Sequence, residues 1–547
     1  MKTSLASDHP GPQLDAAPRL HFIGDAEPLP AGITPAVLGF KAFNLARMAA
    51  IGLRVPPAFV LDTQWCARLE TITPAIWRDG LDRLERATRL KLGDPRKPLL
   101  LSVRSGAPVS MPGMMETLLN IGLTETTLPG VIRMTGNPRL AWDAYRRLVA
   151  SYGEVVAGID ARRFDADLDS VRGSTDEREL DFVALRDLAR RHLDTYAREA
   201  PAPFPQSAEV QLRDAILAVF KSWEGEKAHT YRELHGLLHA MGTAVTVQSM
   251  VFGNAGGMSG AGVGFTRNPS NGDPALWIDF LFNAQGEDVV SGRRSAQGHD
   301  ELAAVAPQVW AELVEATKLL EHQFGDMQDF EFTVQDEQFF LLQTRTGKRT
   351  PQAAARIALD LLDEGVIDAA TARERTAGLD ARNLAIRVVA SGDGRPLSPI
   401  ASAATAASGV VCGQIAFSEA GAREGKAAGH SVILVRRDAE TRDIAALDLA
   451  DGLLTQRGAR TSHAAVVARQ LGKVCLVGCE TLGIDEAGGR ITFGDVVMRE
   501  GDTLTLDGNE GLIYAGATEI QEQIPADLVS RLDRLRDVPD EQPAVNK

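Results

Sequence analysis

The chain has 547 residues and a mass of 58.7 kDa, too long for one hydrophobic core, so we expect roughly three or four domains. Its 44% hydrophobic and 24% charged residues are typical of a globular protein, and no apolar run is long enough to cross a bilayer, which argues against a membrane protein. A net charge of −15 disfavours nucleic acid as a partner, and the N-terminal sequence lacks the apolar segment of a secretory signal, so a cytoplasmic location is expected.

Changes in residue pattern along the chain predict a multidomain α/β (α+β) protein. Strand patterns occur in two separated regions, which we expect to form one α/β domain interrupted by helices. Small and turn-forming residues near 390–408 indicate a hinge. The predicted segments are the first part of the α/β domain at 20–125, a helical insert at 126–242, the second part at 243–350, a helical linker at 351–408, a compact α/β domain at 409–520, and a helix with a polar tail at 521–547.

The segment LLSVRSGAPVSMPGMMETLLNIGL combines an apolar strand, Arg104, a loop of small residues and an apolar run that we expect to be helical. Such a loop lets backbone N–H groups approach phosphate, and a guanidinium matches the geometry of phosphate oxygens. Arg104 is therefore a candidate phosphate ligand. The alternative is a solvated arginine on an exposed loop.

The segment GNAGGMSGAGVGFTRNP is rich in glycine and lies between strand patterns. It suits a hairpin loop that folds over the phosphates of a nucleotide, because glycine permits close approach of the backbone. A strand rather than a helix follows it, which excludes the dinucleotide-binding fingerprint. An ordinary flexible hairpin is the alternative.

Alternation in MQDFEFTVQDEQFFLLQTR places Asp329 and Glu331 on one face of a strand and two phenylalanines on the other. A hairpin turn brings Gln343 roughly opposite Glu331, and Arg345 follows on the same strand. Carboxylate and amide oxygens beside phosphate are what Mg²⁺ prefers, and Arg345 can balance the negative charge. The alternative is a solvated strand face.

The segment LLTQRGARTSHAAVVARQLGK predicts a strand, a turn at Gly458, Thr461 and Ser462 as candidate N-caps, and His463 in the first turn of a helix. A neutral imidazole can attack a phosphoryl group and pass it on. The helix N-terminus favours the arriving phosphate and lowers the pKa of an imidazole beside it. His463 is therefore the strongest candidate for a catalytic residue, with a structural histidine as the alternative.

With these residues in view, the chain resembles the pyruvate phosphate dikinase and phosphoenolpyruvate synthase family from GFKAFNLARMAAIGLRVPP to TLDGNEGLIYAG. The blocks SVRSGAPVSMPGMMETLLNIGL, GVGFTRNPSNGD, NAQGEDVVSG, MQDFEFT, LQTRTGKRT and TSHAAVVARQLGK look like that family's sequence and occur in its order. The resemblance implies an ATP-grasp nucleotide-binding domain with a helical insert. It also implies a mobile phosphohistidine domain that swivels on linkers between the ATP site and a distant acceptor site.

The resemblance also assigns roles to individual residues. It implies ATP phosphate contacts at Lys41, Arg104 and Arg345, and a further cofactor-binding residue at Asp279, where the family has an acidic residue. It also implies magnesium ligands at Glu331 and Gln343, the phosphorylated histidine at His463, and supporting positions at Asp329, Thr461, Ser462 and Gly458. ATP and Mg²⁺ are therefore the expected substrate and cofactor.

Three features depart from the family pattern. Gly-Ala-Arg, ending at Arg460, replaces the usual Gly-Gly-Met and is closer to phosphoenolpyruvate synthase, which leaves inorganic phosphate or water open as the second phosphate acceptor. Phe40 and Phe43 flank Lys41 and can alter how the nucleotide sits. The family's carboxy-terminal barrel, which binds pyruvate and phosphoenolpyruvate, has no counterpart after residue 520, so we expect a partner subunit to bind the acceptor.

The leading hypothesis is a dikinase-type phosphotransferase subunit. ATP phosphorylates His463 with release of AMP, and the phosphoryl group passes to a small-molecule acceptor, such as a phenolic compound or pyruvate, on a partner subunit. One alternative is a stand-alone kinase for a small free acceptor. The other is a non-catalytic ATP-binding phosphocarrier or regulator.

Overall fold

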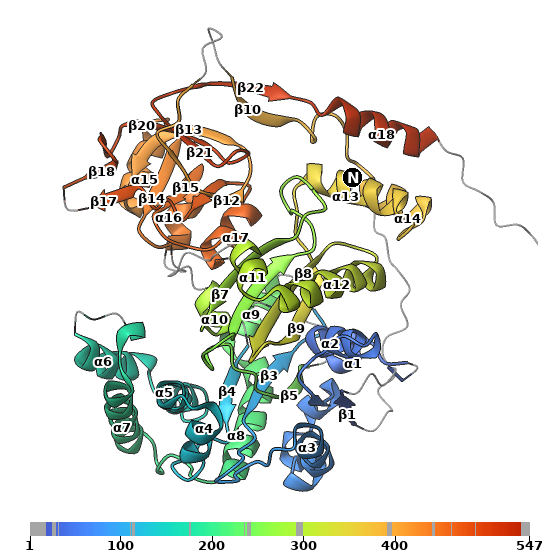
Figure 1. The fold of residues 1–547 in the computed structure, drawn as a ribbon, viewed down its shortest axis with the longest axis vertical. Coiled ribbons are helices and arrows are strands. Elements are labelled where there is room, and N and C mark those ends of the chain that lie inside the picture. The colour runs from blue at the N-terminus through green and yellow to red at the C-terminus, as the bar shows by residue number, and fades with distance from the viewer. Residues whose placement is uncertain are drawn as a thin grey trace, which may run out of the picture. The chain divides into compact units, whose positions relative to one another are not determined.

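The structure, a computed structural model, comprises two compact units, Met1–Val251 with Phe340–Gln343, and Phe252–Phe339 with Thr344–Lys547 (Figure 1). No helix in the part of the chain it describes is long and apolar enough to cross a membrane. The described residues are 18–537 apart from 25–28, 31, 110, 112–114, 174, 176, 235, 238–241, 291–298, 391–396, 440–442, 461 and 487.

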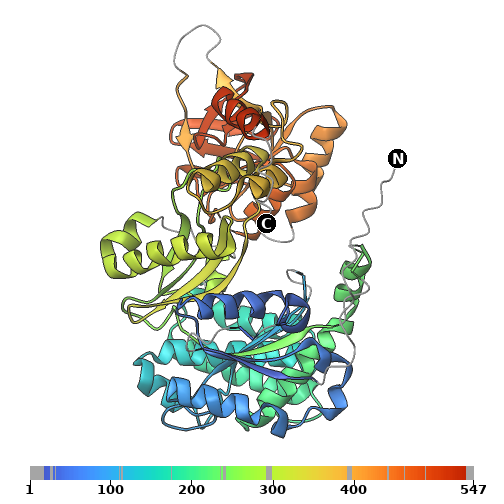
Figure 2. The ribbon, with the colours of Figure 1, turned by 90° about the vertical axis from the view of Figure 1, so that its right-hand side faces the viewer.

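The first unit is built on an antiparallel sheet in the order β1-β2-β5-β3-β4. Its strands are β1 (Leu20–Ile23), β2 (Ala58–Leu61), β3 (Leu101–Gly106), β4 (Thr117–Ile121) and β5 (Ala244–Ser249). Every residue of β2 and β5 is buried, as in the middle of a covered sheet. Helices α1 (Pro35–Leu38), α2 (Phe40–Ala50) and α3 (Pro74–Thr88) belong to this unit, and Figure 2 shows helices on both sides of the sheet.

The apolar run after Arg104, expected to be helical, forms β4 instead. Leu118 and Ile121 are fully buried there, and the strand pairs with β3. The helical prediction is wrong because a short apolar run carries no periodicity that separates a buried strand from a helix, and pairing with a neighbouring strand decides the outcome.

The described part of the chain between β4 and β5 consists of helices joined by loops. Helices α5 and α7 pack through Tyr152 and Tyr196, with Phe204 edge-on to both rings. Asn137, at the start of α5, is one of several side chains that cap these helices. The helices are α4 (Leu128–Thr135), α5 (Pro138–Val155), α6 (Ala161–Arg172), α7 (Phe182–Glu199), α8 (Ala208–Lys221) and α9 (Glu226–Leu234), and short 3₁₀ helices lie at Thr63–Ala67, Leu69–Thr71, Glu177–Glu179 and Ser222–Glu224.

The second unit contains a sheet in the order β7-β6-β8-β9. Its strands are β6 (Gly260–Phe265), β7 (Trp277–Phe282), β8 (Gln328–Gln335) and β9 (Gln338–Thr346), accompanied by α10 (Gly286–Val290), α11 (His299–Val305) and α12 (Pro307–Phe324). Asp336 and Glu337 have φ angles of 49° and 65°, the left-handed conformation that a two-residue hairpin turn requires, so the predicted hairpin between β8 and β9 is confirmed.

The glycine-rich segment does not form the expected hairpin, because β5 and β6 belong to different sheets. Three of its glycines lie within β6, and two of them, Gly260 and Gly262, leave room for phenylalanine rings. A Cβ at Gly260 would lie 2.2 Å from the Phe280 ring, and one at Gly262 would lie 2.3 Å from the Phe332 ring. The prediction was wrong because the rings that require these glycines are distant in sequence.

The C-terminal part of the second unit holds a sheet in the order β11-β21-β20-β13-β14-β15-β16-β12, with β13 to β16 parallel. Ile433 and Val435 of β14 project into one hydrophobic core, and Leu434 projects into a second core on the other face. The strands are β11 (Ala401–Ser402), β12 (Ala404–Ala407), β13 (Val410–Ala416), β14 (Val432–Arg436), β15 (Gly452–Thr455), β16 (Val474–Val477), β20 (Thr503–Asp507) and β21 (Leu512–Ala515), with a separate three-stranded sheet of β17 (Leu482–Asp485), β18 (Arg490–Phe493) and β19 (Val496–Arg499), and helices α15 (Glu419–Ala427), α16 (Ile444–Leu449) and α17 (His463–Gln470).

Both ends of this α/β segment meet in a two-stranded ribbon. β10 (Ile386–Ala390) pairs antiparallel with β22 (Glu519–Gln523), and α18 (Ala526–Asp537) packs through its leucines on α13 (Pro351–Asp363) and α14 (Ala369–Thr376). The tail therefore begins with a strand before its predicted helix. The mixed multidomain α/β architecture confirms the predicted fold class.

Candidate functional site

In the first unit, the start of α2 touches the end of β3 through Gly39 and Gly106. Gly39 has φ 73° and ψ 154°, a region that only glycine adopts readily. A Cβ there would lie 1.9 Å from the Gly106 carbonyl oxygen. The exposed Lys41 and the partly buried Arg104 each lie two residues along the chain from this contact. The close contact between Gly39 and Gly106 therefore helps to fix the positions of both predicted phosphate ligands of this unit.

Arg104 lies on β3, directly opposite Thr117 of β4 and Thr246 of β5. Directly opposite residues of antiparallel strands project from the same face. The hydroxyl of Thr246 is buried and has no hydrogen-bond partner among the described atoms. Leaving a buried hydroxyl unpaired costs about 1–3 kcal/mol, so this face suits an anionic ligand that pairs with both Arg104 and Thr246.

In the second unit, Asp279 of β7 and Glu331 of β8 flank β6, each directly opposite Val263. All three side chains project from the same face, with the two acidic positions about 10 Å apart because neighbouring strands are about 5 Å apart. Asp279 is buried and Glu331 is partly buried. Phe280 and Phe332 project into the core on the opposite face. The alternation expected for β8 is therefore present.

Asp329 lies two residues before Glu331 on the same face of β8. Arg345 Nε donates a hydrogen bond to its carboxylate at 2.7 Å. Burial raises the pKa of Asp329 because it disfavours the charged form, and the positive charge of Arg345 opposes that effect. The ion pair holds a guanidinium beside the acidic row.

The predicted magnesium ligands Glu331 and Gln343 lie on the neighbouring strands β8 and β9. Gln343 belongs to the short stretch of β9 that groups with the first unit, so its approach to Glu331 stays a prediction. Among the described residues, no cluster of three or more Asp, Glu, His or Cys side chains could enclose a metal by itself. Mg²⁺ is commonly bound by one or two carboxylates together with substrate phosphates. The oxygen donors here fit a cation that arrives with a nucleotide.

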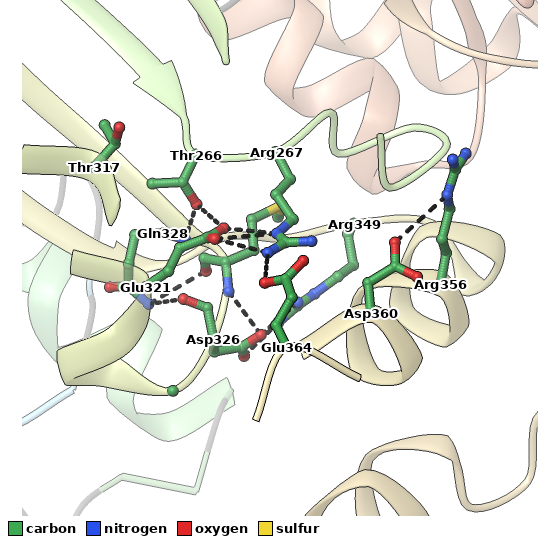
Figure 3. Close-up of polar contacts among 12 residues, drawn as sticks. Thr266, Arg267, Thr317, Glu321, Asp326, Gln328, Arg349, Arg356, Asp360 and Glu364 are labelled. Carbon is green, nitrogen blue, oxygen red and sulfur yellow. Dashed lines mark hydrogen bonds and ion pairs between the residues drawn. The ribbon is translucent and has the colours of Figure 1, made fainter. Parts of the chain in front are cut away.

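A buried polar network lies where β8 begins (Figure 3). Arg267 is 3% exposed and pairs with Glu321 at 2.9 Å and Glu364 at 2.6 Å. Burial alone would lower the pKa of Arg267, but the two glutamates raise it overall. Thr266 donates to Glu321 at 2.6 Å and accepts from the N–H of Gln328 at 3.0 Å. The network joins the ends of β6 and α12 to the first residue of β8.

The same network continues into β9. The Thr344 hydroxyl donates a hydrogen bond to the Gln328 side chain at 3.0 Å. In the chain, Gln328 directly precedes Asp329, and Thr344 directly precedes Arg345. Asp326 accepts two hydrogen bonds from Arg349, both at 2.6 Å. These contacts fix the strand ends that carry the Asp329–Arg345 pair.

The loop between β15 and α17 leads to the predicted nucleophile. Gly458 has φ 132°, a value that glycine tolerates best. Ser462 is the N-cap of α17, and its hydroxyl accepts a hydrogen bond from the N–H three residues on at 3.4 Å. His463 is therefore the first residue of the helix, where backbone N–H groups lack helical partners. Thr461 and the side chain of His463 lie outside the described residues.

Two arginines around this loop contact the sheet that carries Asp279. Arg460 Nε donates to the Asp279 carboxylate at 3.1 Å, and its Nη2 donates to the preceding backbone carbonyl at 2.6 Å. Its guanidinium also lies 4.7 Å from the Trp277 ring centre. Arg469 of α17 lies 5.1 Å from the same ring and 5.4 Å from that of Phe265. The loop before His463 thus rests on the acidic face of the sheet.

Sequence reasoning noted Arg460 only as a departure from a family pattern, and it missed Arg469 and Trp277. Alternation in ALWIDFLF places Trp277 on the same strand face as Asp279, so that half of the contact had a local signal. Arg469 carries no such signal, because its partners are far away in sequence.

Comparison of the sequence with known proteins identifies the family of this chain. A family model described as the pyruvate phosphate dikinase AMP/ATP-binding domain matches residues 67–308 and 299–365, more than half of the chain. The chain belongs to the pyruvate phosphate dikinase family. A second model, the mobile domain of PEP-utilising enzymes, matches residues 428–511, which include the loop and His463. The family consists of phosphotransferases that use ATP as substrate and Mg²⁺ as cofactor.

Curated relatives agree with this assignment. The chloroplastic pyruvate, phosphate dikinase of Flaveria trinervia is 41% identical over 490 residues, which cover 88% of this chain and 51% of the relative. Pyruvate, phosphate dikinase 2 of Zea mays is 41% identical over 503 residues, covering 88% and 55%. Chloroplastic pyruvate, phosphate dikinase 1 of Arabidopsis thaliana is 39% identical over 490 residues, covering 88% and 51%. The chain therefore spans about half the length of the curated relatives it matches.

Proposed function

We propose that this chain phosphorylates its own His463 from ATP and passes the phosphoryl group to an acceptor bound by a partner subunit. The observation that carries the proposal is that the loop before His463 rests on the sheet face that presents Asp279, Asp329 and Glu331. A histidine loop seated on an acidic face with nearby arginines suits phosphoryl transfer from a metal-bound nucleotide.

In this proposal, Lys41 and Arg104 of the first unit and Asp279 and Arg345 of the second contact the nucleotide. The unpaired hydroxyl of Thr246 beside Arg104 supports an anionic ligand on the first sheet. Mg²⁺, when bound, would neutralise charge on the phosphates.

The proposed magnesium ligands are Glu331 and Gln343. The Asp329–Arg345 pair beside them keeps a guanidinium close to the acidic row. A guanidinium in that position can bind phosphate oxygens as charge develops on them.

The histidine step is a displacement at phosphorus. A ring nitrogen of neutral His463 forms a bond to phosphorus while a bridging phosphorus–oxygen bond breaks, and the oxygen leaves with the nucleotide. Conversion of ATP to AMP releases two phosphoryl groups. One stays on His463, and inorganic phosphate or water takes the other. The helix N-terminus that begins at His463 stabilises the negative charge that arrives there.

The proposed acceptor is a small molecule, such as a phenolic compound or pyruvate. The two matched family models describe a nucleotide-binding domain and a mobile domain. A mobile carrier is useful when donor and acceptor sites are separate, so we place the acceptor site on another subunit. The ribbon formed by β10 and β22 joins both ends of the carrier domain and suits a hinge.

The test is to incubate the pure chain with ATP, Mg²⁺ and inorganic phosphate and measure its intact mass. The proposal predicts one added phosphoryl group on the wild type and none on His463→Ala. Lack of phosphate on the wild type, or equal phosphate on the variant, would refute it. Release of AMP supports dikinase chemistry, whereas ADP indicates a simple kinase. Acceptor turnover without a second protein would favour the stand-alone kinase, and ATP binding without phosphorylation would favour the regulator.

A further inference from the structure

We infer that Arg460 is a positioning residue for the phosphorylation of His463, because it docks the histidine loop against β7. This inference rests on the proposed function. It assigns Arg460 the task of orienting the histidine loop, which is separate from binding the nucleotide. Arg460 precedes His463 by three residues, so its anchoring point lies within the same loop.

The contact has the features of a specific anchor. The Asp279 side chain is 3% exposed, so its carboxylate needs a partner that replaces lost water. Arg460 supplies a charge-assisted hydrogen bond to that carboxylate and a second hydrogen bond to the adjacent backbone carbonyl. Its planar guanidinium also lies over the Trp277 ring. A methionine at this position could make the apolar contact but neither hydrogen bond, and a lysine lacks the planar fork.

A second arginine reinforces the anchor from the other side of His463. Arg469 lies six residues after His463 on α17, and it shares the Trp277 ring with Arg460. Its Nη2 donates to the Arg460 backbone carbonyl at 3.3 Å and to the Ala406 carbonyl at 2.5 Å. Burial lowers the pKa of Arg469. His463 is therefore bracketed in the chain by two arginines that contact one tryptophan.

The arrangement also permits release. The anchor consists of one ion pair, a backbone hydrogen bond and two ring contacts, and the Arg460 side chain is 21% exposed. A contact of this size can hold one orientation without locking the domain there. Loss of a charge-assisted hydrogen bond in such a contact lowers the equilibrium constant for docking about tenfold to a hundredfold. At saturating ATP, the rate of histidine phosphorylation should fall by up to the same factor.

The first experiment compares Arg460→Met, Arg460→Lys and Arg457→Met in single-turnover phosphorylation at saturating ATP. Arg457 is an exposed arginine on the same loop and controls for the lost charge. We expect phosphorylation about tenfold to a hundredfold slower in Arg460→Met, partial recovery in Arg460→Lys and no change in Arg457→Met. The rate at which preformed phosphoenzyme loses its phosphoryl group to water, with nucleotide removed, should match the wild type in all three. Equal phosphorylation rates for Arg460→Met and wild type would overturn the inference and leave the proposed function standing.

The second experiment measures docking without catalysis. Spin labels are placed at the exposed positions Leu319 on α12 and Val497 on β19, after replacement of Cys66 and Cys412 by alanine. Pulsed electron–electron double resonance should give one main distance between the two labels when Arg460 is present, and a broad distribution of distances in Arg460→Met. Identical distributions would overturn the inference even if the wild type failed to phosphorylate. A failure of phosphorylation with the expected distance change would instead count against the proposed function.

Discussion

The close approach of α2 to β3 makes a sharp prediction for Gly39→Ala. The added Cβ would lie 1.9 Å from the Gly106 carbonyl oxygen, whereas real Cβ contacts stay above 3.0 Å. The start of α2 must therefore move by about 1 Å to remove the overlap. The φ and ψ of Gly39 add about 1–3 kcal/mol of strain for any other residue.

Movement of α2 displaces Lys41 relative to Arg104. A misplacement of about 1 Å at a catalytic site can reduce the rate about a hundredfold, so phosphorylation of His463 should fall by about that factor. The matched control is Gly52→Ala. Gly52 also has a positive φ of 83°, but a Cβ there meets nothing within 4 Å. The control thus carries backbone strain, about 1–2 kcal/mol, without the clash.

Two measurements on the intact chain test this reasoning. Hydrogen exchange of residues 101–106 should be faster in Gly39→Ala than in Gly52→Ala, because the clash falls on β3. Single-turnover phosphorylation should separate the two variants by about a hundredfold. If they exchange and react alike, the close approach does not position Lys41, and the reasoning is refuted.

Three further predictions address the second unit, the helical insert and the metal. Arg267→Met should lower the free energy of unfolding in urea by about 3–5 kcal/mol, because it leaves Glu321 and Glu364 without their cation. Arg531→Met, at a more exposed ion pair, should cost less than about 1 kcal/mol, and equal losses would contradict the network's role. Burial alone would raise the pKa of Asp143, but the positive charges of Arg147 and Arg146 lower it overall. The ionised carboxylate therefore stabilises the fold above about pH 4, and this contribution is lost as the pH falls further. Acid unfolding followed by circular dichroism should be less pronounced in Asp143→Asn than in the wild type, and an unchanged transition would contradict this. EDTA should abolish phosphorylation, and Glu331→Gln should raise the Mg²⁺ requirement about tenfold to a hundredfold, whereas an unchanged requirement would exclude Glu331 as a ligand.

Local patterns made part of the site predictable. Alternation placed Asp329 and Glu331 on one strand face, since period two is a property of any strand. Ser462 before His463 predicted the start of a helix, because an N-cap side chain bonds only to backbone N–H groups within the next turn.

Contacts between distant segments were beyond the reach of sequence reasoning. Arg460 and Asp279 are separated by 181 residues, and neither sequence neighbourhood reveals the other. Gly260 looked like part of a phosphate loop because the Phe280 ring that excludes a side chain there lies on another strand. The apolar run that forms β4 could not be assigned to a strand or a helix from its own sequence, because its strand conformation depends on pairing with β3.

The most direct test of the central claim is to locate the phosphoryl group and count the nucleotide product together. The chain is incubated with ATP, Mg²⁺ and inorganic phosphate, digested at alkaline pH to preserve phosphohistidine, and sequenced by tandem mass spectrometry while AMP and ADP are quantified. We predict phosphate on His463 and one AMP for each phosphohistidine formed. Phosphate on another residue, or ADP as the matching product, would contradict the account.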